Sequence, residues 1–546
     1  MLVRLARLVL LLPLFLLSCT PTPDHATLVD TPAPIYPDYR DVTIPQNIAP
    51  LNFLLRSDCE AIQVEVGDIT INAGGNEAVF DMDDWKHLMQ NSAGQTIEVK
   101  ITALANGQWT QYKPFSWTVV SDEIDPYLTY RLIEPDYEIW NHLQIQQRCV
   151  ENFDVNALGH YEQLENRCMN CHTYGNQSPD LSMLYVRGPG GGAILNRNGQ
   201  LRKLNLKTDD MVSGSVYFGF SPSGRYITFS TNIIIPGFHS LASKRLEVFD
   251  SKSDVYVADL ETNTMLRSPL LCDSTVFETF PTFSPDGKYI YYCAADSVLL
   301  PRDIKQLQYS LVRIPFDEKT GQFGTQVDTL VQHAAVPQQQ RKRSVCHPRI
   351  SPDGRYLLYT VADYGTFPIW HPEADLQMMN LETGTVDTLA IVNSDKSDTY
   401  HAWSSNSRWF VFASKRDDGL YGKPYFCYVD QDGKAHKPFC LPQEHPTFYD
   451  NCLKSFNAPE LGKGKVPFDI FDVAKAMKQE AEKFHLARMT RLYSIRTRPF
   501  LLQKPCPYAV KPRHPCQIIT SLSFPPAHPT GSPVLPDRHR SRPSSS

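Results

Sequence analysis

The sequence predicts a mainly β protein in which a small β-sandwich precedes a β-propeller of five or six blades. Aromatic residues are frequent, with 26 Tyr and 27 Phe among 546 residues, and aromatic and β-branched side chains favour strands. The first quarter of the chain has short alternating segments between Gly/Asn turns, and the second half repeats one strand–turn–strand motif. A chain of this length allows about two to four domains.

The first residues are typical of an export signal. Arg4 and Arg7 precede an unbroken apolar run from Leu8 to Leu17. This run is too short to cross a bilayer and has the length of the apolar region of a signal peptide. We therefore predict a signal peptide over residues 1–18.

The signal ends in "LLSC", which resembles the lipid-attachment motif of bacterial lipoproteins. The resemblance implies that Cys19 carries a lipid anchor. An ordinary secretory signal with an incidental cysteine is the alternative. The Pro/Thr-rich residues 19–40 suit a flexible tether, so we expect a lipid-anchored protein of the cell envelope, at the outer membrane and facing the periplasm.

Residues 41–124 are expected to form the sandwich, because "AIQVEVGDITI", "TIEVKITALA" and "YKPFSWTVV" alternate between apolar and polar side chains. In size and pattern this region is similar to an immunoglobulin-like domain. Residues 125–180 are richer in helix-compatible side chains, and we predict a connector there.

The clearest internal repeat lies in the second half of the chain. Its four copies are "FSPSGRYITFS" from Phe220, "FSPDGKYIYYC" from Phe283, "ISPDGRYLLYT" from Ile350 and "WSSNSRWFVFA" from Trp403. Pro, Asp and Gly suit successive positions of a tight turn, so each copy predicts two strands joined by a turn. Hairpins such as "DVYVADLETNT" follow most copies, and two hairpins make one propeller blade.

This repeat resembles the TolB-type β-propeller, which we expect over residues 181–470. The segment "LYVRGPGGGAILNRNGQLRKLNLKT" lacks the turn motif but has strand character, so it is a candidate further blade. After the propeller, residues 471–487 have the pattern of an amphipathic helix. The Pro-, Arg- and Ser-rich residues 488–546 are predicted to be disordered.

The segment "NRCMNCHTYGN" carries the strongest chemical signal, because His172 directly follows the pair Cys168 and Cys171. A zinc site needs four ligands, and no second Cys-x-x-Cys follows at ribbon spacing. A thioredoxin-like dithiol expects a βαβ unit, which the flanking sequence does not predict. Haem c fits best: both thiols bind the porphyrin, and His172 is the proximal iron ligand.

Taken together, these features resemble a group of Bacteroidetes-type exported lipoproteins that combine one haem c motif with a TolB-like propeller. The resemblance runs from "DPYLTYRLIEPDYE" through "CMNCHTY" to "HAWSSNSRWFVFASKRDDGLYGKPY". It implies a single covalent haem c on Cys168, Cys171 and His172. It implies no reaction.

The sixth iron ligand is open, because Tyr185 stands where the group carries a histidine before an Arg-Gly step. His401 and His239 are the leading candidates in this sequence. The remaining candidates are Met183, His160, His347 and His371.

Three functions are consistent with these features. The first is a membrane-tethered mono-haem cytochrome that exchanges electrons with a cell-envelope partner. The second is a propeller that binds an envelope protein or glycan and holds a structural haem, and the third is a peroxidase-type haem enzyme. A formal net charge of −6 argues against a nucleic-acid partner, and no Gly-x-Ser-x-Gly elbow supports a peptidase. We therefore expect an electron carrier or binding protein rather than an enzyme.

Two pairs of cysteines are near enough in sequence for cross-strand disulfides. They are Cys272 with Cys293 and Cys427 with Cys440. Sequence alone does not determine the connectivity.

Overall fold

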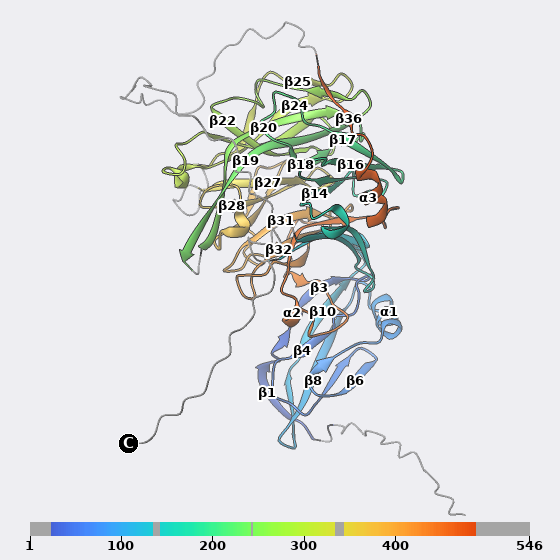
Figure 1. Cartoon of the computed structure of the whole chain (residues 1–546). Helices are drawn as coiled ribbons and strands as arrows, with labels where there is room; N and C mark the ends of the chain where they lie inside the picture. The colour runs from blue at the N-terminus through green and yellow to red at the C-terminus, as the bar shows by residue number, and fades with distance from the viewer. Residues whose placement is uncertain (1–22, 24, 135–141, 242–243, 334–342, 488–546) are drawn as a thin grey trace, which may run out of the picture. The chain divides into compact units, whose positions relative to one another are not determined.

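The computed structural model describes residues 23, 25–134, 142–241, 244–333 and 343–487. The predicted signal peptide, Cys19 and the predicted disordered region from 488 therefore lie outside the described residues. Strands dominate the rest (Figure 1). In the described part of the chain, no helix has the length and apolar character needed to cross a bilayer.

Two sheets form the N-terminal region. The seven-stranded sheet contains β1 (Thr27–Pro32), β3 (Val42–Pro45), β5 (Ala61–Val66), β6 (Ile69–Gly74), β8 (Thr96–Ala105), β9 (Gln108–Lys113) and β10 (Phe115–Val120). The three-stranded sheet contains β2 (Ile35–Tyr36), β4 (Phe53–Leu55) and β7 (Glu77–Ala78). Strands β1 and β2 begin within the predicted tether 19–40, so the folded region starts earlier than expected.

A helix that the sequence analysis did not predict, α1 (Met82–Asn91), completes this region. Asp81 caps it, because its carboxylate accepts hydrogen bonds from the backbone N–H groups of Asp83 and Asp84 at 2.9 and 3.1 Å. Trp85 on the helix packs edge-on against Trp117 of β10, with ring centres 5.6 Å apart. Strands β1 and β9, like β3 and β10, pair in parallel, and the immunoglobulin-like assignment stays a prediction.

Six further sheets of the described chain form the blades of a propeller. Blade 1 contains β35 (Ser455–Gly462), β11 (Tyr127–Ile133), β12 (Leu143–Cys149) and β13 (Val155–His160). Blade 2 contains β14 (Met169–Tyr174), β15 (Leu181–Val186), β16 (Gly192–Arg197), β17 (Gln200–Asn205) and β36 (Glu482–Lys483). Blade 3 contains β18 (Ser215–Phe220), β19 (Tyr226–Leu241), β20 (Lys244–Asp259), β21 (Thr264–Leu266) and β37 (His485–Leu486).

The other three blades follow in chain order. Blade 4 contains β22 (Val276–Phe283), β23 (Tyr289–Asp296), β24 (Ser310–Asp317), β25 (Gln322–Phe323) and β26 (Asp328–Val331). Blade 5 contains β27 (Ser344–Ile350), β28 (Tyr356–Ala362), β29 (Asp375–Asn380) and β30 (Val386–Asp387). Blade 6 contains β31 (Asp398–Trp403), β32 (Trp409–Ser414), β33 (Lys423–Tyr428) and β34 (Phe439–Cys440).

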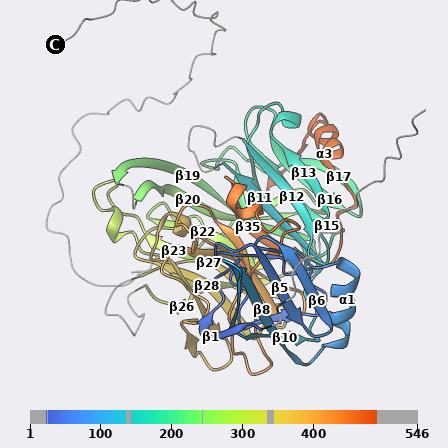
Figure 2. The same cartoon turned by 90° about the horizontal axis from the view of Figure 1, so that it is seen from below.

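The ring closes through blade 1, which combines the two ends of the propeller. Strand β35 follows blade 6 in the chain, yet it pairs antiparallel with β11 along that strand (Figure 2). The inner strands β14, β18, β22, β27, β31 and β35 each contact the next, and β35 contacts β14. The predicted connector 125–180 therefore holds most of blade 1 and the inner strand of blade 2.

The repeated turns follow the expected chemistry. The Ser284 hydroxyl accepts a hydrogen bond from the backbone N–H of Tyr289 at 3.0 Å and donates to Asp286 at 2.6 Å. Gly287 supplies the positive φ of this turn, at 70°. In the fourth copy Ser407 adopts φ of 62° in place of glycine.

The helix predicted over 471–487 is shorter than expected: α3 spans Ile470–Met477. The chain after it is extended, and β36 and β37 add parallel to the outer strands of blades 2 and 3. In this segment, hydrogen bonding to the outer strands β17 and β21 outweighs the local preference for helix. The remaining short helices are α2 (Phe448–Asn451), η1 (Glu162–Leu164), η2 (Ile304–Gln306) and η3 (Pro368–Trp370).

The cysteine pairs suggested by the sequence form no disulfide within the described residues. The thiol of Cys272 donates to the carbonyl of Val255 at 3.3 Å, and that of Cys427 donates to the carbonyl of His436 at 3.2 Å. Burial raises the pKa of Cys293, so this thiol is protonated at neutral pH.

Strands β19 and β20 continue beyond blade 3 as a long two-stranded ribbon (Figure 1). Asp250 anchors the ribbon: it is fully buried and accepts hydrogen bonds from Asn232 at 2.9 Å and from Thr366 at 3.0 Å. Burial raises the pKa of the Asp250 carboxyl to about 6, although these hydrogen bonds oppose the shift.

This anchor predicts a pH-dependent difference between the protein and Asp250→Asn. Between about pH 4 and 6 the native carboxyl holds a proton that the unfolded chain has released, so the wild type loses this stabilisation as pH rises through 6. The asparagine side chain that replaces the carboxyl group does not ionise, so the variant has no such pH dependence. Its free energy of unfolding relative to wild type is therefore expected to rise by up to about 3 kcal/mol between pH 4 and 8, measured by urea denaturation. Asp58→Asn, at an exposed position, is the control, and a pH-independent difference for Asp250→Asn contradicts the prediction.

Candidate functional site

Every inner strand of the propeller has a β-bulge at the same position. The strand register shifts there in all six blades. The bulged residues with positive φ are Tyr217, Phe280, His347, Tyr400 and Ala458, and in β14 the register shift falls at Cys171. A bulge re-aims the side chains that follow it, so equivalent residues of all six blades face one place.

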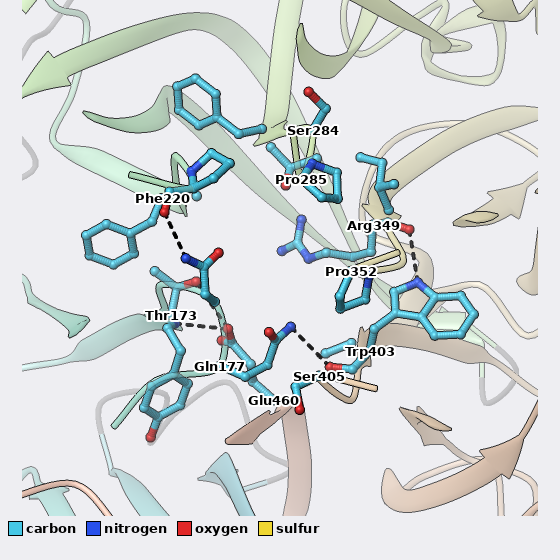
Figure 3. A pocket seen from close by; sticks show the side chains of 18 of the residues that line it. Thr173, Gln177, Phe220, Ser284, Pro285, Arg349, Pro352, Trp403, Ser405 and Glu460 are labelled. Carbon is cyan, nitrogen blue, oxygen red and sulfur yellow. Dashed lines mark hydrogen bonds between the residues drawn. The ribbon is translucent and has the colours of Figure 1, made fainter. Parts of the chain in front are cut away.

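The residues two positions after the bulges surround a cavity at the centre of the ring. They are Thr173, Gly219, Thr282, Arg349, Ala402 and Glu460, and all six line the cavity, whose volume is about 270 Å³. Four of the six are small, which leaves room, and the other two carry opposite charges. Figure 3 shows Arg349 of blade 5 projecting into this axial cavity, which Glu460 of blade 1 also lines.

Glu460 on β35 is fixed by blade 2. Its Oε1 accepts hydrogen bonds from the Thr173 hydroxyl at 3.3 Å and from the backbone N–H of Tyr174 at 3.0 Å. Burial raises the pKa of Glu460 to about 7, while the Tyr174 N–H and the Arg349 guanidinium oppose the shift. At neutral pH this carboxyl group is therefore close to half-protonated.

Arg349 on β27 is the cation of the axial cavity. Its Nη1 donates to the carbonyl of Pro348 at 3.0 Å, and its own carbonyl accepts a hydrogen bond from the Trp403 indole at 3.2 Å. The guanidinium also lowers the pKa values of His347 and His401, after the larger effect of burial. Its field therefore reaches several blades, as expected for a charge near the propeller axis.

Asn176 and Gln177 form one wall of the cavity. Both adopt left-handed backbone conformations, with φ of 52° and 55°. The Asn176 amide donates to the carbonyl of Pro222 at 2.9 Å, and the Gln177 amide donates to that of Trp403 at 3.4 Å (Figure 3). These bonds tie the loop after β14 to blades 3 and 6.

A second cavity, of about 440 Å³, adjoins the first. The two share Asn176, Pro222 and Lys463 in their linings. The second cavity adds the charged residues Asp180 and Arg197. Together the cavities form a polar groove from the axis outward over the turns of blades 2 and 3.

The Cys-x-x-Cys-His segment lies in the first inner strand of blade 2. Cys168 precedes β14, is 8% exposed, and belongs to an apolar cluster with Leu143, Leu164 and Met169. Cys171 is the bulged residue of the strand. His172 follows the bulge, at the position that His401 occupies in blade 6.

His172 and His401 are buried in the same way between neighbouring blades. The Nε2 atom of His401 lies 2.9 Å from the carbonyl oxygen of Leu358 in blade 5. His172 lies beside the backbone carbonyls of Thr129 and Ala458 in blade 1, but neither ring nitrogen makes a well-aligned hydrogen bond within the described residues. Burial lowers the pKa of each histidine to about 3, with a smaller contribution from a nearby arginine. Both imidazoles are therefore neutral blade-packing groups.

In this arrangement the segment does not fit a covalent haem. The Cys168 side chain packs among aliphatic residues between blades 1 and 2, and the His172 ring lies against the backbone of blade 1. Neither residue lines the axial cavity or its neighbour. Binding a porphyrin would require both side chains to leave the blade interface, so haem c stays a prediction.

The structure does not bring His401, one of the two leading sixth-ligand candidates, to His172. His401 lies between blades 5 and 6, whereas His172 lies between blades 1 and 2. His239 is on the β19–β20 ribbon, where its side chain lies outside the described residues. Tyr185 on β15 packs against Phe218, with ring centres 5.9 Å apart. Among the residues described, no group of three or more His, Cys, Asp and Glu side chains could hold a metal ion.

The other histidine candidates have separate environments. His160 stacks on Tyr161 with ring centres 4.6 Å apart, and His371 lies 2.9 Å from a Glu373 oxygen. His347 is buried and contacts Phe280, with ring centres 3.9 Å apart. Met183 is fully buried in β15.

Arg349 and Glu460 were not among the predicted site residues. A signal was present in the sequence, because "CHTYG", "HPRIS" and "YHAWS", which begin at the bulged residues Cys171, His347 and Tyr400, align with one another. In each of these segments, the residue two positions after the bulge lines the axial cavity. The sequence "APELG", which contains Glu460, has no recognisable turn motif, so its place in the ring needed the structure.

Comparisons with known proteins give no family. No known family and no curated protein matches the chain. Among solved structures, it is similar to an oligogalacturonate lyase in complex with manganese, at 12% identity over 57% of this chain and 72% of the lyase, with a TM-score of 0.32. It is also similar to prolyl oligopeptidase B from Galerina marginata, at 11% identity over 59% of this chain and 45% of the peptidase, with a TM-score of 0.31. A puromycin-hydrolyzing peptidase from Mycobacterium tuberculosis gives 11% identity over 77% and 57%, with a TM-score of 0.31.

The chain thus spans less than two thirds of the length of either peptidase. Similarity at this level says nothing about the function of this chain. The propeller fold rests instead on the strand pairing described above.

Proposed function

We propose that the chain is an exported binding protein whose propeller takes a polar ligand in the axial cavity. The observation that supports this most strongly is the ring of six equivalent residues, in which small side chains surround Arg349 and Glu460. Open space at a propeller axis with convergent polar groups is typical of a ligand site. The "LLSC" motif supports anchoring through Cys19 at the outer membrane, and the turn repeats favour a TolB-like propeller.

Binding is favoured over catalysis by the two serine hydroxyls in the lining of the axial cavity. Ser284 donates to Asp286 at 2.6 Å, and Ser405 donates to Asp125 at 2.6 Å. Each hydroxyl belongs to a turn, and its carboxylate partner also accepts a backbone N–H. A nucleophile needs a base directed at the reacting atom, and these two serines are instead used for turn structure.

Filling the axial cavity tests the proposal. A panel of amino acids, organic acids and saccharides is screened by thermal shift against the full chain and Thr282→Phe, since Thr282 is a half-buried lining residue. A compound at about 100 times its Kd stabilises the native state by about 2.7 kcal/mol. We expect at least one compound to raise the Tm of the wild type and of Thr388→Phe, an exposed control, but not of Thr282→Phe. Equal shifts for both variants would place the ligand elsewhere.

The second candidate is the mono-haem electron carrier, with a redox partner in the cell envelope. The Cys168–His172 motif in an exported protein favours it. It requires the β14 segment to rearrange on haem attachment, and a peroxidase-type enzyme has the same requirement. A haem-stained denaturing gel shows whether haem is covalently attached. It compares the wild type with a Cys168→Ala/Cys171→Ala double variant, both expressed together with the haem-attachment machinery. Stain in the wild type alone supports the carrier, and no stain removes both haem functions.

A further inference from the structure

We infer that the ligand of the axial cavity is an acidic saccharide, with one carboxylate on Arg349 and the chain continuing past Lys463 toward Arg197. This inference rests on the proposed binding function and names its ligand class. The two adjoining cavities define the path, because Lys463 lines both.

The charges along the groove favour an anion. Arg349, Lys463 and Arg197 follow one another outward, and the acidic residues in the two linings are Glu460 and Asp180. Arg197 donates to the carbonyl of Gly224 at 2.7 Å, and its buried Nε has no hydrogen-bond partner within the described residues. Arginine is suited to planar carboxylates, because its donors match both oxygens.

The remaining polar groups suit a saccharide. Asn176 and Gln177 use their amide N–H groups on backbone carbonyls, as described above, which leaves amide oxygens as acceptors beside the cavity. The hydroxyls of Thr173 and Thr282 belong to the same lining, and the Trp403 ring borders it. Sugar rings combine hydroxyl groups with an apolar face, so amides, hydroxyls and aromatic rings together match them.

An acidic peptide is disfavoured by the backbone around the groove. Extended peptides commonly bind by adding a strand to an exposed sheet edge. The second cavity is instead lined by the β14–β15 loop, the end of β16 and the β18–β19 turn. No strand edge among these lining residues runs along the groove.

Glu460 gives the site a pH dependence. The charged groups that face it are Arg349 from β27 and Lys463 at the rim, while Thr173 and the Tyr174 N–H contribute neutral donors. His347 and His401 lie deeper and are uncharged near neutral pH. A protonated Glu460 can donate to a ligand carboxylate, whereas its ionised form repels that group. Binding should therefore weaken as pH rises from 6 to 8.

The test uses two trisaccharides that differ only in their acid groups. Binding of β-1,4-triglucuronate and of neutral cellotriose to the full chain is measured by calorimetry at pH 6 and pH 8. We expect triglucuronate to bind and cellotriose not to bind. Arg349→Gln should weaken triglucuronate binding by about 10- to 100-fold, whereas Arg355→Gln, an exposed arginine on the same blade, should have no effect.

Chain length and pH provide two further readouts. Arg197→Gln should weaken binding of the trisaccharide by a larger factor than binding of glucuronate monomer, because Arg197 lines only the second cavity. Lys463→Gln should weaken binding of both ligands, because Lys463 lines both cavities. Glu460→Gln should remove the difference between pH 6 and pH 8 without abolishing binding. A variant that merely unfolds would lose both ligands and the pH comparison together, which circular dichroism of the same samples detects.

The outcomes separate this inference from the proposed function. Equal binding of cellotriose, or binding of triglutamate or inorganic phosphate without triglucuronate, overturns the acidic-saccharide inference. If another class from the screen binds in a manner blocked by Thr282→Phe, the proposed function stands and the inference fails. If no compound binds in the axial cavity, both fail.

Discussion

A chain that ends at Asn451 is expected to lose the closed propeller. The truncation removes β35, which supplies the inner strand of blade 1 and contacts the inner strands of blades 6 and 2. Phe456 and Leu461 on this strand are at most 2% exposed, and without them β11 presents an unpaired edge and an apolar face. We expect the free energy lost with this strand pairing and apolar burial to exceed the roughly 5–15 kcal/mol by which folded domains are stable. We therefore expect no cooperative urea transition and binding of a hydrophobic dye.

The matched control is a chain that ends at Ala487. It retains β35, α3, β36 and β37, which complete the ring and the outer edges of blades 2 and 3. Its urea midpoint should equal that of the full chain. A cooperative transition for the chain ending at Asn451, close to that of the control, would show that β35 does not close the ring.

The blades that contain a copy of the turn motif were predictable from the sequence. Ser, Pro, Asp and Gly each have a fixed role in the tight turn, and the Ser284 and Gly287 geometry follows those roles. Such turns are local, so a short stretch of sequence contains the information. This is why four copies of the motif place four blades correctly.

Blade 1 was not predictable by the same reasoning. Strands β11 and β12 read "YLTYRLI" and "LQIQQRC", and their Leu, Gln and Arg residues are compatible with helix as well as strand. Strand β11 pairs with β35, more than 300 residues later in the chain, and β12 pairs in turn with β11. Local propensity is a weak guide where a long-range partner supplies the hydrogen bonds.

The Cys-x-x-Cys-His segment illustrates how one pattern can serve two purposes. Its spacing matches a haem tether, but His172 also occupies the blade-packing position filled by His401 and, in blade 3, by Phe218. The repeat that reveals this equivalence is the bulge rather than the turn motif. A bulge leaves little trace in residue types, because positive φ occurs here at Tyr217, Phe280 and His347 alike.

The axial cavity follows from the same bulges. Sequence comparison of the inner strands would have aligned Arg349 with Thr282 and Ala402, but not with Glu460, whose blade lacks the turn motif. The pair is brought together only when the chain closes on itself. The sequence therefore did not reveal the site residues that come together only when the ring closes.

Trp409→Ala is expected to destabilise the protein by about 3–5 kcal/mol, the range for removal of a fully buried tryptophan. Trp409 is 0% exposed in β32 and packs on Tyr428 and Phe439, with ring centres 5.0 and 6.2 Å away. Its indole N–H donates to the carbonyl of Asp122 at 2.8 Å. The substitution thus creates a cavity and also leaves a carbonyl of the segment before blade 1 without its donor.

Trp409→Phe separates these two contributions. It keeps most of the aromatic volume but removes the indole N–H, so we expect a loss of about 1–3 kcal/mol from the unpaired carbonyl. Phe471→Ala is the control, because Phe471 is 71% exposed on α3 and surface substitutions usually change stability by about 0.5 kcal/mol or less. Urea denaturation should show lower midpoints for the Trp409 variants at an unchanged slope. Asp122 also accepts a hydrogen bond on its carboxylate from the Tyr428 hydroxyl at 2.6 Å, so two side chains of blade 6 hold the segment that contains it. Equal losses of stability for Trp409→Phe and Trp409→Ala would mean that the hydrogen bond to Asp122, rather than packing within blade 6, accounts for the effect.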